Sequence, residues 1–129
     1  LPFIYSFINN FEKIIPKSLV TSMRTTGVIE IMPIAYMRGI NLDNSIVILD
    51  EAQNCTKDHL KTILTRIGYD SKYIILSDTE QIDRKKKDSS GIQDIMNILS
   101  ALPEIGVMEF TTEDIVRNPL IQKILDQWK

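Results

Sequence analysis

Two adjacent carboxylates end an apolar run near the middle of the chain. Residues 46–49 read IVIL, and Asp50 and Glu51 follow directly. An apolar strand that ends in Asp-Glu is typical of a Walker B site. There the first carboxylate holds Mg²⁺, usually through water, and the second orients or deprotonates the water that attacks a γ-phosphate. An acidic turn at the start of a loop has the same short pattern, so the pair alone leaves both interpretations open.

Polar side chains also follow the next apolar run. Residues 73–76 read YIIL, and Ser77, Asp78 and Gln81 come soon after. A glutamine at such a place can hydrogen-bond both a phosphate oxygen and a water without carrying charge. A polar turn explains either residue taken alone. Two consecutive strands that both end in suitable polar groups favour a shared site.

The phosphate-binding part of such a site is missing from the sequence. A nucleotide site of this kind needs a glycine-rich loop, G-x-x-x-x-G-K-[ST], that leads into the N-terminus of a helix. No stretch of the 129 residues matches this pattern. The sequence therefore carries the hydrolytic half of a nucleotide site and lacks the binding half.

The elements that must position these residues alternate along the chain. Short apolar runs predict strands at residues 28–32, 46–49, 73–76 and 107–110. Residues 56–68 read as a helix that Thr56 caps and Gly68 ends, and helical spacing returns at residues 91–102. The remaining helical segments are residues 1–26, broken at Pro16, and the stretch that begins with Asn118 and Pro119.

This alternation predicts an α/β fold, a parallel sheet flanked by helices. The strands are apolar throughout, as expected when helices cover both faces of the sheet. In such folds ligands gather at the carboxyl ends of the strands, which is where Asp50, Glu51, Asp78 and Gln81 are expected.

The overall composition restricts the alternatives. A length of 129 residues suits a single domain, and the net charge of −2 argues against nucleic-acid binding by the chain as a whole. One cysteine and one histidine exclude an internal disulfide and a Cys/His metal cluster, which suits a reducing, cytoplasmic setting. No apolar run approaches the roughly 20 residues that cross a bilayer, so no membrane contact is expected. Because the sequence begins with Leu1, we expect a fragment or a processed product.

Several segments resemble one family in combination. IEIMPIAYMRG, VILDEAQN, LTRIG, SDTEQID, SSG and TTEDIVRNPLIQKI occur in this order and together resemble the C-terminal part of the PhoH family, ATP-binding proteins related to the superfamily 1 helicases. The resemblance covers nearly the whole chain. It implies that residues 1–129 form a single domain, the C-terminal part of a PhoH-like ATPase domain with a partial RecA-like P-loop NTPase core. It also implies that the Walker A region lies upstream of residue 1.

The resemblance further implies a role for each polar residue of the site. Asp50 assists Mg²⁺, and Glu51 serves as the catalytic carboxylate. Gln53 lies near the phosphates, and Asp78 and Gln81 form a sensor of the γ-phosphate. The family usually has Gly-Asp at the sensor where this chain has Ser77-Asp78, and residues 82–91 also depart from its usual turn.

Basic residues supply further candidates. A phosphoryl-transfer site commonly needs a guanidinium, often from a neighbouring subunit. Arg66 is the first candidate and Arg117 the second, and either is also explained as a surface or structural arginine. Arg38 suits nucleic-acid contact or a helix end equally. The run RKKK at residues 84–87, which includes Lys85 and Lys86, could bind a phosphate backbone, but the flanking Asp83 and Asp88 favour a solvated loop.

The leading interpretation is an ATPase domain that uses ATP and Mg²⁺, coupled to RNA and assembled into a homo-oligomeric ring in the intact protein. Without the phosphate-binding loop, we expect the 129 residues alone to bind ATP poorly or not at all. The rival interpretation is a binding or assembly module that keeps the fold and has lost its phosphate-binding loop.

Overall fold

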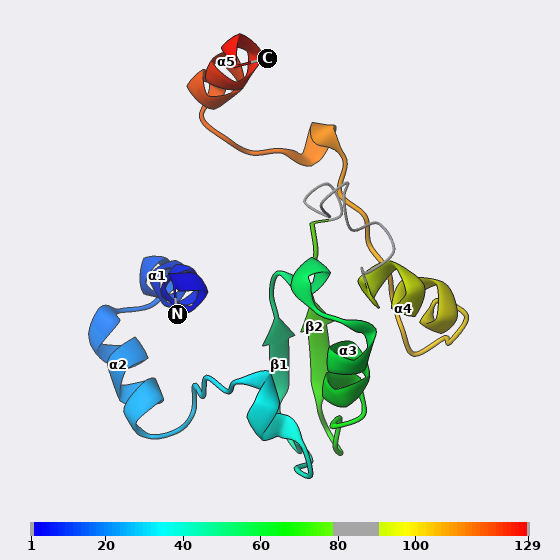
Figure 1. Cartoon of the computed structure of the whole chain (residues 1–129). Helices are drawn as coiled ribbons and strands as arrows, with labels where there is room; N and C mark the ends of the chain where they lie inside the picture. Colours follow the sequence, from blue (N-terminus) through cyan, green and yellow to red (C-terminus); the bar gives the residue numbers. More distant parts are fainter. Residues whose placement is uncertain (1, 79–90, 129) are drawn as a thin grey trace. The chain divides into compact units, whose positions relative to one another are not determined.

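The computed structural model describes residues 2–78 and 91–128, which form two compact units, residues 1–92 and residues 93–129. Figure 1 shows the elements along the chain. In the first unit these are α1 (Pro2–Ile14), α2 (Lys17–Thr25), the 3₁₀ turn η1 (Ile34–Met37), β1 (Ile46–Leu49), the 3₁₀ turn η2 (Ala52–Asn54), α3 (Lys57–Leu64), β2 (Lys72–Ile75) and the start of α4 (Gly91–Leu99).

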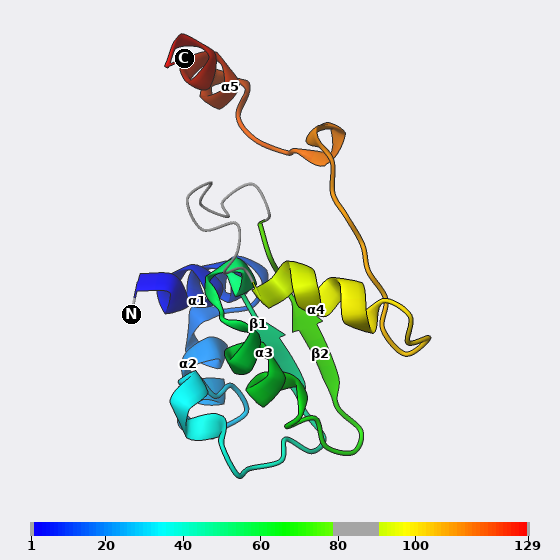
Figure 2. The same cartoon turned by 45° about the vertical axis from the view of Figure 1, so that its right-hand side comes forward.

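The two strands form a parallel sheet. Ile46 pairs with Lys72 at one end of the register and Leu49 with Ile75 at the other. Helix α3 is the crossover between them, and both views place it beside the strands (Figures 1 and 2). The α/β class with parallel strands, predicted from the alternation of apolar runs and helical segments, is confirmed.

Helix α3 begins where the sequence predicts. The Thr56 hydroxyl accepts the His59 N–H at 3.2 Å, and the His59 ring nitrogen Nδ1 accepts the Thr56 N–H at 3.3 Å. This reciprocal pair is a capping box, which satisfies two donors that the first helical turn leaves without partners. The helix ends at Leu64 with Thr65 as its C-cap, earlier than the predicted stop at Gly68.

The core of the first unit lies under α3. Leu60 and Ile63 of this helix are fully buried. Side chains alternate along β1, so that Val47 and Leu49 are half-buried while Ile46 and Ile48 are exposed. One face of the sheet is therefore covered, and the prediction that helices cover both faces is wrong for the described residues.

Two of the four predicted strands are not strands in the structure. Residues 28–32 and 107–110 are described, and neither range pairs with a neighbour. Val28, Met108 and Phe110 are exposed there. Their apolar and β-branched residues suit a strand, but a strand forms only where another strand exchanges backbone hydrogen bonds with it. Among the described residues β1 and β2 pair only with each other.

The segment after α3 packs closely against the residues that precede β1. Leu42 and Ile67 form a parallel bridge, and the Gly68 N–H donates to the Leu42 carbonyl at 2.9 Å. A Cβ added to Gly68 would lie 2.7 Å from that carbonyl oxygen and would overlap the Asp43 carboxylate. Glycine is therefore required here by contact, not by a special backbone conformation.

We expect Gly68→Ala to lower the free energy of unfolding by about 1–3 kcal/mol, because the added methyl group forces apart two backbone segments. Gly106→Ala is the matched control, since a Cβ at Gly106 meets nothing within 4 Å. Urea unfolding of both variants measures the difference. Equal unfolding midpoints for the two would contradict the close packing at Gly68.

The second unit contains the rest of α4, the 3₁₀ turn η4 (Thr112–Asp114) and α5 (Pro119–Gln127). A capping box stands at the start of η4, where the Thr111 N–H donates to Asp114 Oδ2 at 2.7 Å. Helix α5 begins after Asn118, as the sequence predicts, and Asn118 Oδ1 accepts the Leu120 N–H at 3.0 Å. Within residues 93–128, the described part of this unit, no side chain is fully buried. Across the described residues of the chain no helix has the length and apolarity to cross a membrane.

Candidate functional site

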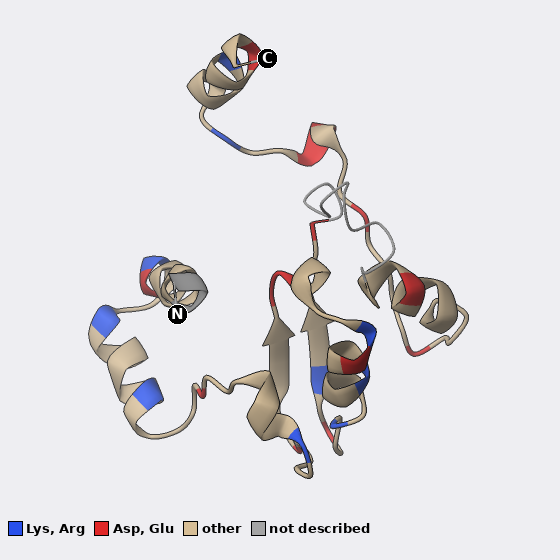
Figure 3. Ribbon diagram, viewed as in Figure 1, with Lys and Arg blue, Asp and Glu red and all other residues tan. Residues whose placement is uncertain are grey.

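The predicted carboxylates lie at the carboxyl end of the sheet. Asp50 follows the last residue of β1 directly, and Asp78 follows β2 after two further residues. Figure 3 shows acidic residues at the segment after each strand. Because β1 and β2 are parallel neighbours, both segments leave the sheet at the same edge. The structure thus brings together the two strand ends that the sequence predicts to share a site.

Glu51 has an unusual backbone conformation. Its φ of 55° and ψ of 39° are left-handed, a region that glycine adopts easily and that costs other residues of order 1–3 kcal/mol. The Glu51 N–H donates to the Asp50 carboxylate oxygen Oδ1 at 2.9 Å. This turn therefore reverses the chain at the strand end and fixes one oxygen of Asp50.

Two further contacts hold the turn against β2. The Ala52 N–H donates to the Leu76 carbonyl at 3.0 Å, which continues the pairing of the two chains beyond the sheet. The Gln53 side chain is 8% exposed, and its Nε2 donates to the Glu51 carboxylate oxygen Oε2. Its Oε1 accepts the Asp78 N–H at 3.0 Å. Gln53 thus links the end of β1 to the end of β2.

Ser77, the position that departs from the family's usual Gly-Asp, has a contact in this cluster. Its hydroxyl donates to Gln53 Oε1 at 3.4 Å, beside the Asp78 N–H. A glycine could not supply this second donor. Gln81, the other predicted sensor residue, lies outside the described residues.

The donor set suits Mg²⁺ held mainly by water and phosphate. Asp50 is half-buried, and the contact from the Glu51 N–H occupies Oδ1, which leaves Oδ2 for a water of the ion's shell. The described residues hold no group of three or more His, Cys, Asp or Glu side chains that could enclose a metal. Mg²⁺ commonly takes one or two carboxylates, several waters and substrate phosphates, so the residues fit the ion without such a cage.

Arg66 lies at the other end of the sheet. Its carbonyl accepts the Leu42 N–H at 2.9 Å, and Leu42 precedes β1, whereas Asp50 follows it. The four residues of β1 span about 13 Å at the usual rise per residue. The structure therefore does not bring Arg66 together with Asp50 and Glu51 of the same chain.

The Arg66 guanidinium lies near the Tyr73 ring of β2. Burial raises the pKa of Tyr73, and the positive charge of Arg66 partly offsets that rise. Arg66 Nη2 donates to the Thr65 hydroxyl at 3.4 Å. Neither Arg66 Nε nor the Tyr73 hydroxyl, both buried, has a hydrogen-bond partner within the described part of the chain.

The other basic candidates are either exposed or outside the described residues. Arg38 is exposed and forms the C-cap of η1, next to Gly39 with its φ of 79°. Arg117 is exposed in the second unit, between η4 and α5. Lys85 and Lys86 fall within residues 79–90, which the structure does not describe.

Sequence reasoning missed two structural roles near the site. His59 completes the capping box of α3. Gly91 is buried at the start of α4, and a Cβ there would lie 2.7 Å from Lys57 Cα and would also overlap the Lys57 amide nitrogen. The SSG segment that ends at Gly91 does not by itself indicate this close approach. Cys55 is buried as a small packing residue, and burial raises the pKa of its thiol.

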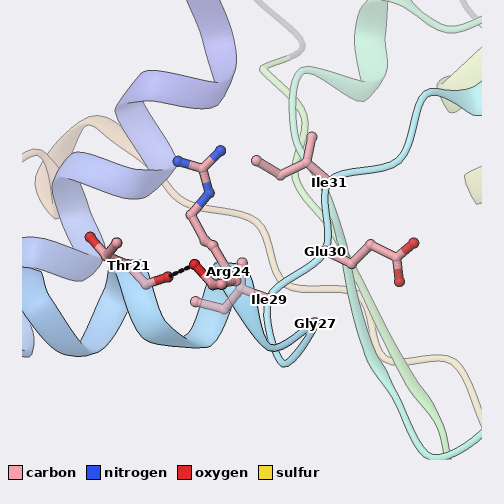
Figure 4. Close-up of a pocket in the computed structure, with 7 residues that line it drawn as sticks. Thr21, Arg24, Gly27, Ile29, Glu30 and Ile31 are labelled. Atoms are coloured by element: carbon pink, nitrogen blue, oxygen red, sulfur yellow. Dashed lines mark hydrogen bonds between the residues drawn. The ribbon is translucent and has the colours of Figure 1, made fainter.

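A separate pocket lies at the C-terminal end of α2. Figure 4 shows Arg24 extending into it beside Ile31, and the Thr25 hydroxyl donates to the Thr21 carbonyl at 2.9 Å. The pocket is open, and Asp50, Glu51, Gln53 and Asp78 do not line it. It is therefore not part of the carboxylate cluster.

Comparison with known proteins identifies the family. The family model described as PhoH-like protein matches residues 1–129. A PhoH-like protein of Mycobacterium tuberculosis is 35% identical over 127 residues, which cover 98% of this chain and 36% of that protein. A PhoH-like protein of Bacillus subtilis is 46% identical over 102 residues, 79% of this chain and 32% of that protein. Protein PhoH of Escherichia coli is 40% identical over 99 residues, 77% of this chain and 28% of that protein.

The chain thus spans about a third of the length of the curated relatives that it matches. The parallel α/β core, the Asp-Glu pair at the end of β1 and the match of the family model over residues 1–129 agree with one another. The chain belongs to the PhoH-like protein family.

Proposed function

We propose that the chain is the hydrolytic part of a Mg²⁺-dependent ATPase. The observation that carries this proposal is the cluster at the carboxyl edge of the sheet, in which Asp50 and Glu51 follow β1 and Gln53 links Glu51 to Asp78 after β2. Ligands of parallel α/β folds gather at this edge. The carboxylate pair after an apolar strand suits phosphoryl transfer to water.

Each side chain of the cluster has its own role in the proposed hydrolysis of ATP. Asp50 would hold the waters of Mg²⁺ through Oδ2, while the Glu51 N–H keeps its other oxygen in place. When bound, the ion would neutralise negative charge on the phosphates. The oxygen of the attacking water forms a bond to the γ-phosphorus while Glu51 accepts a proton from that water. The bond between the γ-phosphorus and the β-phosphate oxygen breaks, which leaves ADP and inorganic phosphate. Asp78, which follows β2, and Gln81, which lies outside the described residues, would sense the γ-phosphate.

The phosphate-binding loop and a guanidinium must come from elsewhere. The relatives are about three times as long as this chain, which leaves room for the loop in a full-length protein. Because Arg66 lies at the opposite end of the sheet from Asp50, its guanidinium suits the site of a neighbouring copy better than its own. We propose a ring-like homo-oligomer on this ground, and coupling of ATP turnover to RNA as the accompanying activity.

The test is phosphate release by the full-length protein. We expect ATP hydrolysis that requires Mg²⁺, that EDTA abolishes, and that single-stranded RNA changes. Residues 1–129 alone serve as the comparison and should neither hydrolyse ATP nor bind it at micromolar concentration. Absence of Mg²⁺-dependent hydrolysis in the full-length protein, with and without RNA, would rule out the ATPase and favour a binding or assembly module.

A further inference from the structure

We propose that Gln53 is a positioning residue, which holds the Glu51 carboxylate in one orientation and couples it to the end of β2, and that it does not bind the nucleotide itself. The inference rests on the proposed function, since it concerns the residue that accepts the proton from water. Sequence resemblance alone places Gln53 near the phosphates. The structure gives its amide a different set of partners.

The surroundings of Gln53 are unusual for this chain. It is the one buried polar or charged side chain among the described residues, at 8% exposure. It follows Ala52, which is fully buried and whose N–H donates to the Leu76 carbonyl. The backbone next to the amide is therefore fixed as well. A buried amide without partners costs about 1–3 kcal/mol, which makes its contacts a strong constraint on the local geometry.

Both ends of the Gln53 amide have partners within the protein. Nε2 donates to Glu51 Oε2, and Oε1 accepts the Asp78 N–H at 3.0 Å and the Ser77 hydroxyl at 3.4 Å. These contacts use Oε1 as an acceptor twice and one of the two Nε2 hydrogens, and the burial of the side chain at 8% exposure limits access of a phosphate to the other hydrogen. The amide therefore serves as a bridge between the two strand ends.

Only one orientation of the amide satisfies these partners. Glu51 Oε2 can only accept and the Asp78 N–H can only donate, so a flipped amide would oppose acceptor to acceptor and donor to donor. Gln53 thus fixes one carboxylate oxygen of Glu51 and leaves the other for water. It also transmits any shift of the Asp78 segment to Glu51, because the same amide contacts both.

Two substitutions separate the ends of the bridge. Gln53→Leu removes both contacts at similar volume. Gln53→Glu retains an acceptor for the Asp78 N–H and replaces the donor to Glu51 by a carboxylate oxygen that repels it. Gln122→Leu is the matched control, because Gln122 Nε2 also donates to a carboxylate, Asp126 Oδ1 at 2.9 Å, but in the exposed setting of α5.

Three quantities are measured in the full-length protein: kcat at saturating ATP, the Kd for ATP, and the backbone amide NMR signal of Asp78 after labelling with ¹⁵N-aspartate. We expect both Gln53 variants to lower kcat by about 10–100-fold, as loss of a group that orients a reactive side chain usually does. The Kd should change by less than about twofold, because the substitutions leave the contacts to ATP in the ground state unchanged. The Asp78 signal should shift in Gln53→Leu, and the Gln122→Leu protein should match the wild type.

A double-mutant cycle with Glu51→Gln distinguishes positioning from general damage. If Gln53 acts through Glu51, adding Gln53→Leu to Glu51→Gln should cost less than about threefold in residual turnover. A purely structural role would multiply the two losses. Multiplied losses, or a weaker Kd with unchanged kcat, would overturn the proposal.

Failure of the function and failure of this inference give different results. A full-length wild-type protein without Mg²⁺-dependent hydrolysis overturns the ATPase and the positioning role of Gln53 with it. An active wild type whose Asp78 signal is unmoved in Gln53→Leu overturns the bridge alone. An active wild type, a shifted Asp78 signal and non-additive losses together support the proposal.

Discussion

Replacement of Glu51 by glutamine in the full-length protein is expected to lower kcat for ATP hydrolysis by about 10²–10⁴-fold, the usual contribution of a general base. Glutamine keeps the shape of the side chain but cannot accept the proton of the attacking water. ATP affinity should persist, because Asp50 and its contact with the backbone N–H of residue 51 do not depend on that carboxylate. Steady-state phosphate release and equilibrium ATP binding measure the two effects separately.

The control is Glu104→Gln, which makes the same chemical change at an exposed position in the second unit. It should leave both turnover and binding at wild-type values. If Glu51→Gln keeps wild-type turnover, Glu51 is not the proton acceptor. If it loses ATP binding together with turnover, the carboxylate contributes to the ground state and not to the chemical step alone.

Leu60→Ala is expected to lower the free energy of unfolding by about 2–5 kcal/mol. Leu60 is 0% exposed, and it lies on α3 beside Ile63 in the core that supports the covered face of the sheet. Removal of most of its side chain leaves a cavity that the surrounding strands cannot fill without moving. Urea unfolding followed by circular dichroism gives the change.

Leu19→Ala is the matched control, because Leu19 belongs to the same unit and is 46% exposed. Its loss should cost less than about 1 kcal/mol, since little apolar area returns to water. Equal destabilisation by the two substitutions would mean that the packing of α3 does not hold this unit together. Loss at Leu60 should also reach the site, because Thr56 at the start of α3 follows the turn of Asp50, Glu51 and Gln53.

The parts of the fold that are determined by residues close together in the sequence could be predicted. Four consecutive apolar residues before Asp50 define β1, and the cap chemistry of Thr56 and Asn118 defines where two helices begin. The parallel pairing follows from the helix between the strands, because such a crossover returns the chain in the same direction. These local patterns were sufficient to place Asp50, Glu51 and Asp78 at one edge of the sheet.

The position of Arg66 could have been predicted and was not. A helix that follows β1 runs back along the sheet, so its last turn reaches the edge where the strands begin. Arg66 follows the end of α3 and lies at that edge. The spacing of the TRIG segment after the Asp-Glu pair therefore already separated the arginine from the carboxylates of its own chain.

The remaining differences depend on contacts between distant segments. Whether residues 28–32 or 107–110 become strands depends on a partner that their own composition does not specify. The two-sided bonding of Gln53 depends on the register between the ends of β1 and β2, which no spacing within one segment encodes. Gly91 likewise became informative only once its contact with the start of α3 was visible.

If Glu51 accepts the proton as proposed, its left-handed backbone places stability and activity in opposition at one residue. Glycine or asparagine would relieve the strain at a φ of 55°, and neither carries a carboxylate. Selection for a stable fold alone would therefore remove the glutamate, whereas selection for proton transfer would retain it. Stabilising substitutions in this protein are better sought at positions outside the turn, where a gain in stability does not remove a group needed for activity.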